Sequence, residues 1–135
     1  GYSSPSIRED GTTLAAVGAL CFQIWESSAN RQARKAVKFM HENMKLDWKT
    51  KHSDLYGHYY AAQAMINNGG KEWEKYNELF RDQVLNNQNK DGSYKSVQAG
   101  HGLNGGGFAE HYRTCLATLM LESYYRFLPG TGQKN

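Results

Sequence analysis

The feature that most constrains the fold of this chain is an alternation between uncharged and charged helical segments. Hydrophobic periodicity and helix-ending signals predict five helices, over residues 12–25, 30–44, 55–66, 72–87 and 112–127. The first, third and fifth carry almost no charge, whereas the second and fourth have an apolar stripe opposite a charged face. A helix that is apolar all round must be covered on several sides. The alternation therefore predicts an all-α fold with two layers, an inner layer of apolar helices and an outer layer of amphipathic ones.

This two-layer interpretation predicts which individual side chains are buried. Residues of the uncharged helices should be almost fully buried, namely Leu20, Cys21, Ile24, Ala62, Met65, Cys115, Leu116 and Leu119. Cations of the amphipathic helices should be exposed, namely Arg34, Lys38 and Lys75. Cys21 and Cys115 are interpreted as small buried hydrophobes, because two cysteines make neither a disulfide framework nor a zinc cluster.

A weak internal repeat supports stacked helix pairs. Thr13–Ala16, Tyr60–Gln63 and Thr114–Ala117 each begin an uncharged helix, at intervals of about 50 residues. The 135 residues hold about two and a half such units and are interpreted as a single domain, residues 1–135. The chain begins with Gly1 rather than methionine, so we expect a fragment of a longer chain.

Composition excludes several classes of protein. The net charge of +3 is too small and too scattered for a dedicated nucleic-acid binder. No apolar run approaches the roughly 18 residues of a membrane helix, so we expect no membrane span.

Three stretches of the sequence carry a family resemblance. Leu85–Tyr94, with Gln88, Asp91, Gly92 and Tyr94, resembles the Gln…Gly-x-Trp repeat of squalene cyclases and protein prenyltransferases, with tyrosine where tryptophan is usual. Tyr59–Asn77 and Tyr112–Pro129 look like a bacterial branch that carries prenyltransferase/squalene-oxidase repeats. The resemblance implies an α/α toroid, of which this chain would supply a partial ring of about five helices.

The resemblance does not bring the family's catalytic groups with it. Cyclases of the family use an Asp-x-Asp-Asp acid, and here Asp47 and Asp54 stand apart. Prenyltransferases hold zinc with a histidine in a Tyr-His-Thr-Cys stretch, and this chain reads Tyr112-Arg113-Thr114-Cys115. Arginine keeps its proton and cannot ligate zinc. We therefore expect no bound zinc and no cofactor.

Two further motifs are interpreted as structural. His52, Asp54 and His58 could bring metal ligands to one helix start, but a polar helix entrance is the favoured interpretation. Gly100–Gly105 matches Gly-x-Gly-x-x-Gly but lies between helices, without the strand that a dinucleotide site requires. We interpret it as a linker, with a lid as the alternative.

The remaining candidates for ligand binding are aromatic and polar residues where two uncharged helices begin. They are Tyr56, His58, Tyr59, Tyr60, Glu110, His111, Tyr112 and Arg113. The alternative is that these residues only cap and pack the rim of the helical layer.

The functional prediction is a binding or interaction module of the toroid class without its own catalytic acid or zinc. The alternative is part of a terpenoid-cyclase-like or prenyltransferase-like enzyme whose catalytic residues lie outside this chain, so the sequence does not decide whether a reaction is catalysed.

The expected partner is the rest of a longer chain or a second copy, bound through the apolar first or fifth helix. A small apolar ligand is a further expected partner. The first helix would offer Leu14, Val17, Phe22 and Trp25, and the fifth Leu119, Tyr124 and Tyr125. Relatives of the resembled branch are often exported, which slightly favours an envelope or secreted location.

Overall fold

A computed structural model describes residues 11–50, 52–94 and 109–126, and within these residues the chain is all-helical. The helices are α1 (Gly11–Trp25), α2 (Arg31–Asn43), α3 (Leu55–Asn68), α4 (Gly70–Asn86) and α5 (Ala109–Arg126). Each lies within a few residues of a helix predicted from the sequence, so the all-α class is confirmed. The described part contains no strand, only an isolated antiparallel bridge between Gln88 and Tyr94.

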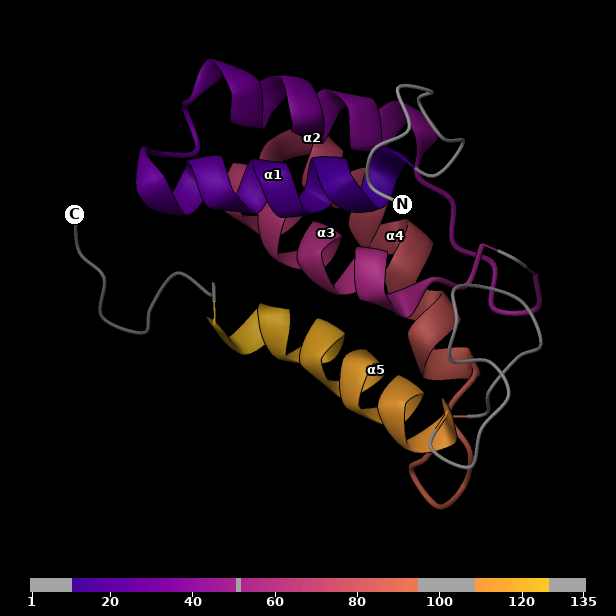
Figure 1. Cartoon of the computed structure of the whole chain (residues 1–135). Coiled ribbons are helices and arrows are strands. Elements are labelled where there is room, and N and C mark those ends of the chain that lie inside the picture. Colours follow the sequence, from indigo (N-terminus) through magenta and orange to yellow (C-terminus); the bar gives the residue numbers. More distant parts are fainter. Residues whose placement is uncertain (1–10, 51, 95–108, 127–135) are drawn as a thin grey trace.

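The helices form two layers (Figure 1). α3 packs against α1 on one side and α5 on the other, and these three helices run in the same direction. α2 and α4 run back in the opposite direction and contact each other. α2 packs against α1 and α3, and α4 packs against α3. We call α1, α3 and α5 the three-helix layer. Because its helices are parallel, their N-terminal ends lie along one edge of the molecule.

Local sequence explains where the helices begin and end. The Asn30 side chain accepts hydrogen bonds from the backbone N–H groups of Gln32 and Ala33, at 2.7 and 3.0 Å, and so caps α2. Gly69 and Gly70 both have positive φ, 68° and 64°, which a residue with a side chain rarely adopts. This glycine pair allows α4 to begin directly after α3 ends.

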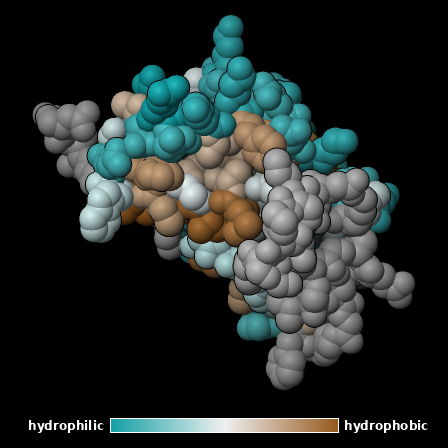
Figure 2. Space-filling model, turned by 45° about the horizontal axis from the view of Figure 1, so that its top comes forward, coloured by the Kyte–Doolittle hydropathy of each residue, from teal (hydrophilic) through white to brown (hydrophobic). Residues whose placement is uncertain are grey.

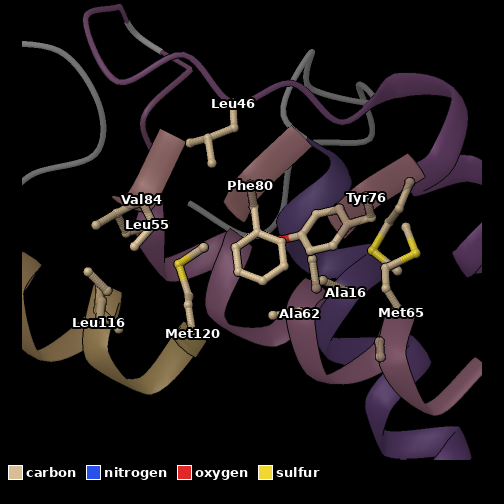
Figure 3. Packing of buried hydrophobic residues seen from close by; sticks show 14 of the residues in the cluster. Ala16, Leu46, Leu55, Ala62, Met65, Tyr76, Phe80, Val84, Leu116 and Met120 are labelled. Atoms are coloured by element: carbon tan, nitrogen blue, oxygen red, sulfur yellow. The ribbon is translucent and has the colours of Figure 1, made fainter. Parts of the chain in front are cut away.

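The core lies between the two layers. The ring of Phe80 lies between Tyr76, which is also in α4, and Met120 of α5. It points toward Ala62 of α3 (Figure 3). Tyr124 of α5 packs on Phe80 with ring centroids 5.8 Å apart. α4 therefore holds α3 and α5 together through aromatic contacts.

The burial prediction is confirmed for some residues and wrong for others. Leu20, Ala62, Met65 and Leu116 are buried, and Arg34, Lys38 and Lys75 are exposed, as predicted. Cys21, Ile24 and Cys115 are exposed and Leu119 is half-buried, contrary to the prediction. The reason is that α1 and α5 end the three-helix layer, so one side of each faces no other described helix.

The exposed residues of α1 form a continuous apolar surface. Leu14, Ile24 and Trp25 are 61%, 75% and 88% exposed. We call the whole surface the open face of α1. It is formed by the exposed residues Leu14, Cys21, Phe22, Ile24 and Trp25 and by the half-buried residues Val17 and Gly18. Figure 2 shows it as an apolar band beside the hydrophilic surface of α2. The sequence-based expectation of an apolar edge at the first helix is therefore confirmed.

The corresponding surface of α5 is different. Its exposed residues, which we call the open face of α5, are Glu110, His111, Cys115, Thr118 and Tyr125. Each of these side chains carries a polar or ionisable atom, and Leu119 and Tyr124 are half-buried. The expectation of a second apolar edge at the fifth helix is therefore wrong apart from Tyr125.

One polar side chain fixes how α1 faces α3. Gln23 is buried, and its amide nitrogen donates to the carbonyl oxygen of Ala64 at 2.9 Å. Asn67 donates to the amide oxygen of Gln23 at 3.5 Å. The hydrogen bonds place the buried face of α1, which includes Ala16, Ala19 and Leu20, against the rest of the fold.

No helix among the described residues is both long enough and apolar enough to cross a membrane.

Candidate functional site at the rim of the three-helix layer

The N-terminal ends of α1 and α3 are joined by one carboxylate. Asp54 caps α3 by accepting the backbone N–H of Tyr56 at 3.2 Å, and it also accepts the Thr13 hydroxyl of α1 at 3.2 Å. Gly57 allows this approach, because a Cβ there would lie 2.5 Å from the Thr13 hydroxyl oxygen. The contact positions the tyrosines that follow Asp54.

Three tyrosines of α3 contact one another beside this junction. The Tyr56 and Tyr60 rings meet edge to face with centroids 5.1 Å apart, and their hydroxyl oxygens are 3.5 Å apart. Tyr59 and Tyr60 also meet edge to face, at 5.0 Å. The hydrogen bond with Tyr56 is the main cause that raises the pKa of Tyr60 to about 12, so the Tyr60 phenol stays neutral at physiological pH.

Tyr112 of α5 completes what we call the tyrosine rim, formed by Tyr56, Tyr59, Tyr60 and Tyr112. Partial burial raises the pKa of Tyr112, and the nearby charge of Asp54 and the Tyr56 side chain raise it further. The rim thus draws on two helices and presents phenol groups, which can stack on an apolar ligand and donate hydrogen bonds to it.

His58 lies in the core rather than at the surface of the rim. The Nε2 atom of His58 is 3.1 Å from the carbonyl oxygen of Lys45. The Tyr76 hydroxyl oxygen is 3.0 Å from the Nδ1 atom of His58 and 3.0 Å from the backbone carbonyl oxygen of His58. Burial lowers the pKa of His58 to about 4, so the ring is neutral near pH 7. Since a carbonyl can only accept, Nε2 carries the proton. His58 therefore links α3 to α4 and to the segment after α2.

Arg113 is also buried, and its contacts join separate elements of the fold. Its Nη1 atom donates to the carbonyl oxygen of Ser53 at 3.0 Å, and its guanidinium carbon lies 4.6 Å from the centroid of the Trp48 ring. Burial lowers the pKa of Arg113, and nearby Asp54 opposes that shift. The position that the resemblance assigns to zinc ligation thus holds a cation that joins α5 to the α2–α3 connection.

The remaining predicted rim residues, Glu110 and His111, are exposed on α5. The Nε2 atom of His111 lies 3.8 Å from the Cys115 sulfur on the same helix. The structure therefore divides the predicted set into a tyrosine rim, two buried structural residues and two exposed residues of α5. That any of these residues contacts a ligand stays a prediction.

The repeat-like segment after α4 forms a closed turn. The Gln88 side chain donates to the carbonyl oxygen of Gly92 at 3.0 Å, and Asp91 accepts the backbone N–H of Ser93 at 3.0 Å. Tyr94 is buried against Trp48, with ring centroids 5.4 Å apart. Its backbone N–H donates to the Thr114 hydroxyl at 3.0 Å, so this turn attaches the end of α4 to α5.

The metal motif considered from the sequence does not assemble. Within residues 11–50, 52–94 and 109–126, no three His, Cys, Asp or Glu side chains lie close enough to hold one ion. The absence of zinc from the protein stays a prediction. The glycine-rich segment Gly100–Gly105, considered as a linker or lid, lies outside the described residues.

Two groups of contacts were missed by sequence reasoning. Trp48 belongs to a segment between predicted helices, where no periodicity marks it as the partner of Arg113 and Tyr94. The bond between Thr13 and Asp54 spans 41 residues, and only a tertiary structure shows it. The usable signal was Asp54 itself, because an aspartate directly before an apolar helix is a capping residue.

Comparisons with protein-family models, with curated proteins and with solved structures each find no match to this chain.

Proposed function

We propose that this chain is an arc of an α/α toroid that acts as a protein-interaction module and docks through the open face of α1. The observation that carries the proposal is the exposure of Leu14, Ile24 and Trp25 on a helix without any charged residue. Contiguous apolar surfaces of this kind mark interfaces, whereas single exposed hydrophobic residues do not.

The arrangement of the helices supports the toroid part of the proposal. α1, α3 and α5 are parallel neighbours, and α2 and α4 return on the other side (Figure 1). Stacked helix pairs bury their apolar faces against neighbouring units, so a terminal unit needs either a polar face or a partner. The open face of α5 is polar, and the open face of α1 is apolar. The arc is therefore suited to exposure at α5 and to a partner at α1.

A substitution of matched aromatic residues tests this function. Trp25 and Tyr125 lie near the C-terminal ends of α1 and α5 and are 88% and 75% exposed. We expect the wild-type chain to associate in sedimentation experiments between about 1 and 200 µM. Trp25→Lys should abolish the association, and Tyr125→Lys should leave it unchanged. Unchanged circular dichroism of both variants would show that each still folds.

Two results would contradict the proposal. A wild-type chain that stays monomeric over the whole concentration range would show that the open face of α1 remains exposed to solvent without a partner. Equal effects of the two lysine variants would show that association does not depend on α1.

A second candidate function is the binding of a small apolar ligand at the tyrosine rim. It is favoured by Tyr56 and Tyr60 of α3, whose rings and hydroxyl groups are close together. A prenyl alcohol such as farnesol is a suitable probe, because the family resemblance implies prenyl-like compounds. Chemical-shift changes confined to the rim and lost in Tyr60→Ala would support this function, and uniform or absent changes would contradict it. Membership of a larger enzyme stays a prediction.

A further inference from the structure

The segment that follows α2 closes over one edge of the core. We call residues 45–50 the strap. Its Leu46 and Trp48 side chains are buried, and Leu46 points toward Val84 and Phe80 of α4 (Figure 3). The strap has no helical or strand structure, so contacts with the surrounding helices hold it in place.

Three helices hold the strap. His58 of α3 donates from its Nε2 atom to the carbonyl oxygen of Lys45 at 3.1 Å. Gln83 of α4 accepts the backbone N–H of Trp48 on its amide oxygen, also at 3.1 Å. The guanidinium carbon of Arg113 in α5 lies 4.6 Å from the centroid of the Trp48 ring. The strap therefore joins α3, α4 and α5 at this edge.

The histidine contact requires a neutral ring. The Tyr76 hydroxyl lies 3.0 Å from the Nδ1 atom of His58 and donates to the His58 carbonyl oxygen. A proton on Nδ1 would turn that atom into a second donor that faces this hydroxyl, and it would bury a charge in a ring that is closed off from water. We propose that the strap opens as a unit, while the helices stay folded, when His58 takes up a proton. The proposal does not involve the open face of α1 and goes beyond the proposed function.

The groups around His58 do not compensate for a buried positive charge. Asp54, at the start of α3, favours the protonated ring, but burial outweighs it and lowers the pKa of His58 to about 4. α1 carries no charged residue, and the cations of α2 are exposed. α4 contributes the Tyr76 phenol, whose pKa is raised by burial, and Arg113 of α5 donates to the neighbouring Ser53 carbonyl. The strap itself has one half-buried and two exposed charged residues, Asp47, Lys45 and Lys49.

Amide hydrogen exchange of Trp48 measures the opening directly. Its N–H bonds to Gln83 across the closed strap, whereas the N–H of Phe80 lies inside α4 and reports the opening of the helical core. The closed state has the lower His58 pKa, about 4 against an ordinary 6.5, so closure is fully favoured above pH 6.5 and weakens toward pH 4. The opening equilibrium should therefore rise about 20-fold between pH 7 and 5. We expect the protection factor of Trp48, measured by NMR on the whole chain, to be lower than that of Phe80 and to fall by this amount.

Two histidines give a matched pair of variants. His52 lies just beyond the strap and is half-buried. His58→Gln should reduce the pH dependence of Trp48 exchange to within about twofold, and His52→Gln should leave the 20-fold change in place. Circular dichroism shows whether each variant folds. If His58→Gln does not fold, the wild type and His52→Gln still decide the question.

Three results would overturn the inference. Equal protection of Trp48 and Phe80 would show that the strap opens only when the core unfolds. Weaker protection of Trp48 without a change between pH 7 and 5 would show that opening does not depend on His58. Loss of the pH dependence in His52→Gln would assign it to the wrong histidine. Each of these results would leave the proposed function standing.

Discussion

The two ends of the three-helix layer look alike in sequence and differ in structure. α1 and α5 are similar in length, both have a long uncharged stretch, and each packs on one side of α3. α1 turns small residues such as Ala16 and Ala19 toward the fold and exposes Ile24 and Trp25. α5 turns Leu116 and Met120 inward and exposes His111 and Thr118. The number of apolar residues in a helix therefore does not say which face they occupy, and that distribution decides whether an end of the layer needs a partner.

The largest expected effect tests whether the apolar residues of α5 are held by the core. Phe80→Ala removes the ring between Tyr76, Tyr124 and Met120 and should lower the free energy of unfolding by about 4 kcal/mol. Trp25→Ala, on the open face of α1, should change it by less than about 0.5 kcal/mol. Denaturant unfolding at low protein concentration measures both. Similar losses for the two aromatic residues would mean that α1 is covered like α5.

The next effect separates the stability of the fold from association through α1. The folded-state pKa of His58, about 4, lies below its ordinary value of 6.5, so the unfolded chain binds more protons between these values. The contribution of neutral His58 to the free energy of unfolding is fully present above pH 6.5. It decreases by about 3 kcal/mol as the pH falls toward 4.

Association should respond differently to acid while the chain remains folded, because α1 has no carboxylate and no histidine. Unfolding curves between pH 4 and 7 measure the first effect, and sedimentation at the same pH values measures the second. His58→Gln should remove the histidine part of the pH dependence, at a cost in stability near pH 7. A variant with the same pH slope as the wild type would contradict the role assigned to His58.

A third prediction concerns the contact between α1 and α3. Gly57→Ala would place a methyl group 2.5 Å from the Thr13 hydroxyl oxygen, so the two helices must separate or Thr13 must rotate away from Asp54. We expect a loss of about 2 kcal/mol in the free energy of unfolding. Thermal unfolding of the monomer measures it. A neutral result would show that α1 is more loosely held than α5.

The smallest effect has the opposite sign. Gly18→Ala adds a methyl group in open space and replaces a glycine in the interior of a helix, which should stabilise the monomer by about 0.5–1 kcal/mol. The same methyl group should weaken association, because Gly18 belongs to the open face of α1. Thermal unfolding in dilute solution and sedimentation at high concentration separate the two effects. Stabilisation with unchanged association would place the contact elsewhere.

Much of the fold could be predicted from the sequence because its signals are local. Asp54 and Asn30 cap their helices, and Gly69–Gly70 separates α3 from α4 near the expected place. The buried faces of α2 and α4 follow from the position of their charges. The inward faces of α1 and α5 could not be predicted in this way, because an uncharged helix does not mark its solvent side. For this reason Cys21, Ile24 and Cys115 were expected in the core.

The candidate site could be predicted only as a group of residue types. Tyrosines clustered at the start of a helix indicated the rim, and Tyr56, Tyr59 and Tyr60 do contact one another. His58 and Arg113 belonged to the same predicted set, but each is buried in a structural contact. Sequence neighbours on a helix point in directions about 100° apart, so proximity along the chain does not place side chains on one surface.

The buried amide of Gln23 has a further consequence for α1. A helix that is apolar on every side gains similar hydrophobic energy whichever side it buries, so the hydrophobic effect alone selects no rotation about its axis. Rolling α1 would move Gln23 away from the Ala64 carbonyl group and leave the buried amide nitrogen of Gln23 without its acceptor. The amide, together with the hydrogen bond between Thr13 and Asp54, therefore fixes the rotation of α1 about its axis. It makes the outward surface of α1 a defined one, rather than one of several that the same sequence could present.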